Sequence, residues 1–268
     1  SSDVCSSDLN HSDWILLLAY MCVGVLVGVW YFVWNLDGPL SFVQEFDNAF
    51  HLNLIHAYMK TERFSIFQAT VFPSSFSLLS DLSFYPAAWH VVCALVGSIL
   101  GLSASMAENV GIAAFLLFVF PSSIYAFTSV VFHDSFRLKL TASFFMFAFA
   151  SFPWGFLVAG PLYSNFASFS LLPCVLALFI KMIECNKSND RARWTAVFVL
   201  ASIALALSQP NSIFTAAFIL LPYVFIRPFI TDAIDGAVRR KNIQRVVLFS
   251  IAVLFLLVVV FNSSSFSA

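Results

Sequence analysis

The chain has 268 residues, of which 60% are hydrophobic, 10% are charged and 33 are phenylalanine. Several apolar runs approach the ~20 residues needed to cross a bilayer, so the composition predicts a multi-spanning α-helical membrane protein and excludes a soluble one. The formal net charge is -1. No basic stripe interleaves with exposed aromatic residues, and a nucleic-acid partner is therefore not expected.

Residues 1–9 contain Ser-Ser-Asp twice and resemble the translation of a sequencing adapter. We therefore set them aside as an expected artefact, as is done for processing scars. Residues 10–268 are then expected to form a single transmembrane domain, as a fragment of a longer protein.

Seven apolar runs are expected to span the membrane as helices, because polar residues or Pro and Gly separate them. They cover residues 14–34, 110–132, 140–159, 166–183, 195–208, 213–226 and 246–261. An eighth run, 87–102, is apolar but carries His90 and two glycines. The expected fold class is thus all-α, a polytopic transmembrane helix bundle of about seven spans, with eight as the alternative.

Lysine and arginine concentrate in cytoplasmic loops. Of the 13 basic residues, all except Lys60 and Arg63 lie at three boundaries, in 137–139, 181–193 and 227–245. If 87–102 does not span and the N-terminus is inside, these boundaries are cytoplasmic and 35–109 forms an extracytoplasmic loop. Eight spans with an external N-terminus would also place these basic residues inside. We favour the first arrangement, because a helix with a histidine and glycines makes a poor lone span.

The densest polar cluster, Gln44-Glu-Phe-Asp47-Asn48-Ala-Phe-His51, directly follows the first apolar run. Residues 44–59 lack Gly and Pro and predict a helix at the membrane surface with its apolar side down. Its polar side would hold Gln44, Asp47, Asn48 and His51. Its apolar side would hold Phe46, Phe50, Leu54 and Ala57. Ionisable residues gathered at a membrane boundary are typical of a functional site.

Asp47 and His51 would lie one helical turn apart. The carboxylate could accept a proton from a nucleophilic hydroxyl, while the imidazole orients the acid or contacts the substrate. Asp47 is therefore a candidate general base, although the two side chains could also pair only to satisfy polar groups at the interface. A divalent cation is a further alternative for the acids and histidines of this loop, but their spacing matches no recognised metal motif.

Three more segments are expected on the same outer side. Tyr85, Trp89 and His90 lie at the end of the first loop. An aromatic ring there could stack on a sugar or provide an apolar surface for a prenyl chain. Alternatively, these residues only form part of the aromatic belt at the membrane interface. Tyr163 follows Gly160 and Pro161. Gly and Pro interrupt a helix at such places and leave backbone N–H and C=O groups without helical partners. These groups then need a cavity lined by water or protein. The last segment surrounds Pro210 and contains Gln209 and Asn211.

These segments together resemble a known group of proteins. The residues that carry the resemblance are Asp47-Asn-Ala-Phe-His51, Tyr85-Pro-Ala-Ala-Trp89-His90, Phe152-Pro-Trp154, Gly160-Pro-Leu-Tyr163 and Gln209-Pro-Asn211. They are similar to a family of large, uncharacterised bacterial multi-spanning membrane proteins. That family in turn resembles the GT-C glycosyltransferases, which include protein mannosyltransferases and the catalytic subunits of oligosaccharyltransferases.

The resemblance implies a multi-pass enzyme of the cell membrane that uses a polyprenyl-phosphate-linked sugar. Asp47 matches the first-loop acid that acts on the acceptor. The expected substrate-binding residues are Asn48, His51, Tyr85, Trp89, His90, Tyr163, Gln209 and Asn211. The class commonly binds the donor phosphate with later basic residues, and here no outer basic residue follows Arg63 in the favoured topology.

The alternative is a non-catalytic lipid or polysaccharide transporter, or an assembly protein of the cell envelope. A transporter is expected to carry ionisable groups near the middle of its spans. The seven expected spans hold almost none, which favours an enzyme with its site at the membrane boundary.

Overall fold

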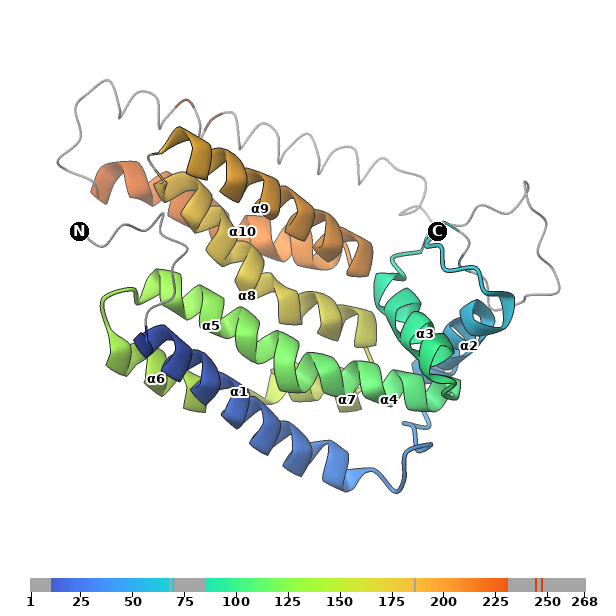
Figure 1. Cartoon of the computed structure of the whole chain (residues 1–268). Helices are drawn as coiled ribbons and strands as arrows, with labels where there is room; N and C mark the ends of the chain where they lie inside the picture. The colour runs from blue at the N-terminus through green and yellow to red at the C-terminus, as the bar shows by residue number, and fades with distance from the viewer. Residues whose placement is uncertain are drawn as a thin grey trace. The chain divides into compact units, whose positions relative to one another are not determined.

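The computed structural model describes residues 11–67, 69, 85–185 and 187–230, together with the isolated positions 244 and 247. The chain forms two compact units, Ser1–Ile213 and Phe214–Ala268. The described part of the first unit is built from helices that run back and forth between its two ends (Figure 1). The long C-terminal helix of the described chain is α10, Asn211–Ile230.

Five helical segments among the described residues are long and apolar enough to cross a membrane. They are His11–Asn35, Ala104–Val131, Phe136–Val158, Tyr163–Glu184 and Ser188–Ser208. At the first five expected spans the chain thus forms helices of membrane-spanning length and composition, which indicates a membrane protein. The apolar part of α10, Asn211–Phe225, is shorter than these five segments. The expected span 246–261 lies outside the described residues.

The first two spanning segments pack closely through glycines. Helix α1, His11–Tyr31, contacts the rod formed by α4 (Ala104–Ala114), the π-helical turn η3 (Phe115–Val119) and α5 (Phe120–Val131). A Cβ atom on Gly24 would lie 2.5 Å from Pro121 Cγ, and one on Gly28 would lie 2.6 Å from Leu117 Cδ1. Two small residues four apart let helix backbones approach within a membrane, where packing rather than water exclusion drives association.

Polar contacts hold the N-terminal half of α1 against α5 and α6. Tyr20 Oη lies 2.9 Å from Thr128 Oγ1 and donates to the Lys139 carbonyl oxygen at 2.8 Å. Lys139 Nζ lies 3.7 Å from Asp13 Oδ1. Lys139 belongs to α6, Phe136–Phe145, so this network joins α1, α5 and α6 at one end of the unit.

The remaining helices of the unit return the chain between its ends. After α6 come η4 (Ala150–Gly155) and the short α7 (Phe156–Val158). Helices α8, Tyr163–Glu184, and α9, Ser188–Ser208, then form an extensively packed pair. The basic residues of the α5–α6 and α8–α9 connections lie at the end where α1 begins (Figure 1).

The first loop forms a helical cap at the other end, where α4 begins (Figure 1). After the short turn η1, Val33–Asn35, the loop contains α2 (Phe46–Thr61) and α3 (Ala88–Leu100). The 13 residues of α3 rise only ~20 Å, less than the ~30 Å of a hydrocarbon core. Helix α3 is therefore too short to span, and it packs against α2 and α4.

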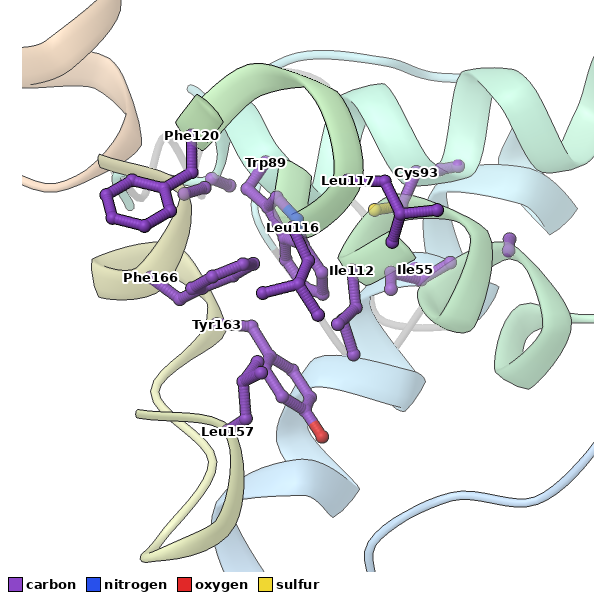
Figure 2. Close-up of a cluster of buried hydrophobic side chains, with 14 of the residues drawn as sticks. Ile55, Trp89, Cys93, Ile112, Leu116, Leu117, Phe120, Leu157, Tyr163 and Phe166 are labelled. Carbon is purple, nitrogen blue, oxygen red and sulfur yellow. The ribbon is translucent and has the colours of Figure 1, made fainter. Parts of the chain in front are cut away.

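A buried aromatic and aliphatic cluster joins this cap to the spanning helices. Figure 2 shows Trp89 of α3 and Tyr163 and Phe166 of α8 gathered around Leu116 of η3. All four side chains are buried. The cluster holds the beginning of α8 close to α3, which places the segment before Tyr163 beside the cap.

Candidate functional site

The buried side of α2 combines residues of both predicted sides, because Asn48, His51, Leu54 and Ala57 are buried while Phe46 and Asp47 are exposed. The helix begins at Phe46, so Gln44 lies outside it, and Phe46 is 90% exposed while Asn48 and His51 are 0% and 6% exposed. Asn48 and His51 are thus buried in the protein, since α2 packs against α3 and α4, whereas the prediction that Phe46 and Phe50 face the membrane stays a prediction. A polar edge can be buried when neighbouring elements supply hydrogen bonds.

Those hydrogen bonds are concentrated on His51. Its Nε2 lies 3.0 Å from the Pro161 carbonyl oxygen, and its Nδ1 lies 2.7 Å from His90 Nε2. A carbonyl oxygen only accepts, so Nε2 of His51 carries the proton. In a neutral ring Nδ1 must then accept, and His90 Nε2 is the donor. His90 Nδ1 is left as an unprotonated atom without a partner.

Burial keeps both rings neutral. It lowers the pKa of His51, an effect that the hydrogen bond to Pro161 and the negative charge of Asp47 partly offset. It lowers the pKa of His90 well below its ordinary value, and the neighbouring His51 lowers this pKa further. Desolvation disfavours the charged form of histidine, so the pair is a neutral hydrogen-bonded unit.

Asp47 lies at the open edge of this buried pair. Its side chain is exposed, and a Cβ atom on Gly160 would lie 3.8 Å from Asp47 Oδ2. Gly160 has φ +66°, a left-handed conformation that glycine adopts without strain. The hydrogen bond from His51 to Pro161 therefore fixes the Gly160–Pro161 turn beside the Asp47 carboxylate.

Aromatic rings surround the pair. Tyr163 lies 5.3 Å from both the His51 and the Trp89 ring, measured between ring centroids. Tyr85 lies 5.8 Å from His90 and is half-buried. Burial raises the pKa of Tyr85, and the negative charge of Asp47 raises it further. The rings of Tyr85, Trp89, His90 and Tyr163 thus lie close to the helix that carries Asp47, Asn48 and His51.

The other two predicted residues lie further along the same end of the first unit. Ser168 Oγ donates to the Gln209 carbonyl oxygen at 3.3 Å, which ties the end of α9 to α8 one turn beyond Tyr163. Gln209 is half-buried and Asn211 is exposed. The ring nitrogens of His51 instead face His90 and the Pro161 carbonyl oxygen.

A buried acid was missed by reasoning from the sequence. Glu108 of α4 is 1% exposed, and neither of its carboxyl oxygens has a hydrogen-bond partner. The Asn48 side chain lies near this carboxyl, and its Oδ1 also lacks a hydrogen-bond partner. A single acid in an apolar spanning segment is a signal that could have identified it. The predicted span began at residue 110, which left Glu108 just outside.

The next residue, Asn109, ties the loop before α2 to α4. Its Nδ2 donates to the carbonyl oxygens of Ser41, at 2.7 Å, and Pro39, at 3.2 Å. The side chains of Asp37 and Glu45 in this loop are exposed. In the part of the chain that the structure describes, no group of three or more His, Cys, Asp or Glu side chains could hold a metal ion.

Comparison with known proteins assigns the chain to a family. Residues 2–267 match the model of a family of unknown function, DUF6541. The chain belongs to this family. No curated protein and no solved structure matched the sequence. For this DUF6541 member, the function must therefore be argued from the site itself.

Proposed function

We propose that this DUF6541 protein is an integral membrane glycosyltransferase of the GT-C type, with Asp47 as the general base. It would transfer a sugar from a polyprenyl-phosphate-linked donor to an acceptor of the cell envelope. The observation that carries the proposal is the exposed Asp47 carboxylate beside the Gly160–Pro161 turn, backed by a buried neutral histidine pair.

The location of this carboxylate supports a boundary enzyme. Asp47 lies on the helical cap, at the end of the first unit opposite the basic α5–α6 and α8–α9 connections. Because basic loops favour the cytoplasm, the cap would face the outer side of the cell membrane. Lipid-linked donors lie in the bilayer, and an acid at its edge can meet both such a donor and an extracytoplasmic acceptor.

The proposed chemistry needs only one base on this chain. The acceptor hydroxyl attacks the anomeric carbon, and the new C–O bond forms as the bond to the donor phosphate breaks. The phosphate leaves with the electron pair of that bond, while Asp47 takes the hydroxyl proton. His51 has both ring nitrogens in hydrogen bonds, so it would position the Gly160–Pro161 turn rather than bind the sugar directly.

The second candidate is a transporter or assembly protein for envelope lipids or polysaccharides. Glu108 favours it, because a buried ionisable group in a spanning segment is typical of transport sites. However, Glu108 is the fifth residue of Ala104–Val131 and thus ~7 Å from its start. This position near the boundary fits the enzyme better than a site near the midplane.

Sugar transfer by the full-length protein in membranes tests the proposal, with polyprenyl-phosphate-linked sugars as donors. Asp47→Asn keeps the side-chain shape but removes the base, and should lower the rate by ~10²- to 10⁴-fold. Asp37→Asn is the matched control in the same loop and should leave the rate unchanged. A folded Asp47→Asn variant with the wild-type rate would refute the assignment. No transfer by the wild-type protein with any common lipid-linked sugar would favour transport or assembly.

A further inference from the structure

The site contains an unusual concentration of buried polar atoms without partners. Among the described residues, every such side-chain atom except Ser129 Oγ belongs to this region. They are Asn48 Oδ1, Trp89 Nε1, His90 Nδ1, Ser164 Oγ and the two oxygens of Glu108. Native structures leave few such atoms, and each calls for a physical explanation. Glu108 is the most demanding case because it can carry a charge.

Within the described part of the chain, no positively charged group acts on Glu108. The titratable groups that face it are the Cys93 thiol of α3 and the Tyr163 phenol of α8. Helix α2 contributes the uncharged Asn48 amide, while its Asp47 charge acts on His51 and Tyr85. An ionised carboxylate buried among these groups would be strongly disfavoured, and such groups take up a proton instead.

A proton on Glu108 would provide a hydrogen-bond donor for Asn48. Its Nδ2 donates to the Val43 carbonyl oxygen at 2.9 Å, but its buried Oδ1 needs a donor. A carboxylate can only accept hydrogen bonds, whereas a carboxylic acid has one O–H donor. A protonated Glu108 would thus satisfy the Asn48 oxygen, and an ionised one would leave it unpaired.

We propose that Glu108 is a neutral carboxylic acid that donates a hydrogen bond to Asn48 Oδ1 and so holds α2 against the membrane helix α4. Because Asp47 is adjacent to Asn48, the bond between α4 and α2 makes Glu108 a positioning residue for the proposed base. Loss of its proton would place an uncompensated charge between the two helices and release α2. The inference extends the proposed function, but its test measures α2 and not sugar transfer.

Hydrogen–deuterium exchange of residues 46–61, with the full-length protein in lipid nanodiscs, tests this coupling. After correction for intrinsic exchange rates, the protection of α2 should fall about tenfold per pH unit above the ionisation of Glu108, the dependence expected for one proton. Glu108→Gln keeps a donor and cannot ionise, so its protection should be high and independent of pH. Glu108→Ala should lower protection at every pH.

The exposed Asp37 provides the matched control, and Asp37→Asn should keep the wild-type pH dependence. The same dependence in wild type and Glu108→Gln, or none in wild type, would overturn the proposal. Infrared spectroscopy tests the protonation of Glu108 directly, whatever the stability of α2. The wild type at neutral pH should show a carboxylic-acid C=O band that Glu108→Gln lacks. Absence of that band in wild type would also overturn it. Both readouts remain valid if no sugar is transferred.

Discussion

Nε2 of His90 lies 2.7 Å from Nδ1 of His51, which joins the beginning of α3 to the middle of α2 across 39 residues of chain. The other nitrogen of His51 continues to the Pro161 carbonyl oxygen, 110 residues later. One imidazole therefore connects both helices of the cap to the turn that precedes α8. The three segments that surround Asp47 are held together by this side chain.

Removal of that side chain should destabilise the protein. His51→Ala leaves the buried His90 N–H and the Pro161 carbonyl oxygen unpaired, and unfolding should require about 3 kcal/mol less free energy. His56→Ala is the matched control, because His56 lies on the exposed side of the same helix and should change stability by about 0.5 kcal/mol or less. Denaturant unfolding in detergent measures both. Equal effects of the two substitutions would contradict the role of His51 as a connector.

The histidine pair should also set an acidic limit to stability. Burial lowers the pKa of both rings in the folded protein, so the unfolded chain binds protons at a higher pH than the folded one. The contribution of the pair is fully present above the ordinary histidine pKa of about 6.5 and is lost as the pH falls through the lowered values. Unfolding measured between pH 8 and pH 4 should show a decline of about 1.4 kcal/mol per pH unit for each histidine.

A double variant separates this effect from general acid sensitivity. His51→Gln with His90→Gln retains a donor and an acceptor at each position but has no ring to protonate. Its stability should depend less on pH over the same range. If the decline is as steep as in wild type, other groups cause it, and the histidine pair does not set the acidic limit.

The contact between α1 and α5 gives a prediction far from the site. A Cβ atom on Gly24 would lie 2.6 Å from the Leu117 carbonyl oxygen and 2.5 Å from Pro121 Cγ, and backbone cannot move aside easily. Gly24→Ala should therefore lower stability by about 1–3 kcal/mol, as overpacked helix contacts do. Leu26→Ala, on the exposed side of α1, should cost less. Thermal unfolding in detergent would show the difference, and a harmless Gly24→Ala would disprove the close packing.

The orientation of the cap can be tested on intact cells. A cysteine in place of the exposed Asp37 should react with a membrane-impermeant thiol reagent, because the basic connections at the opposite end favour the cytoplasm. A cysteine in place of the exposed Asp134, in the α5–α6 connection, should react only after the cells are opened. Labelling is compared with the unsubstituted protein. The reverse pattern would place the cap in the cytoplasm and remove the extracytoplasmic enzyme.

The sequence by itself determined the class of protein and the neighbourhood of the site. Five of its apolar runs correspond to helices of membrane-spanning length, because the thickness of the bilayer makes run length informative without any tertiary contact. It also grouped Asp47, His51, Tyr85, Trp89, His90 and Tyr163, since polar and aromatic residues at span boundaries stand out against an apolar background. The observed helix α2, Phe46–Thr61, begins within two residues of its predicted start.

Only the tertiary structure decided which side of α2 is buried and that Glu108 belongs to the site. Local periodicity predicted that Phe46 and Phe50 face the membrane, but it contains no information on the partners that His90 and Pro161 offer to His51. Glu108 lies 60 residues beyond Asn48, and no sequence pattern links the two. Hydrogen bonds between distant segments depend on how the helices pack, so they emerge only when α2, α3, α4 and α8 have been placed together.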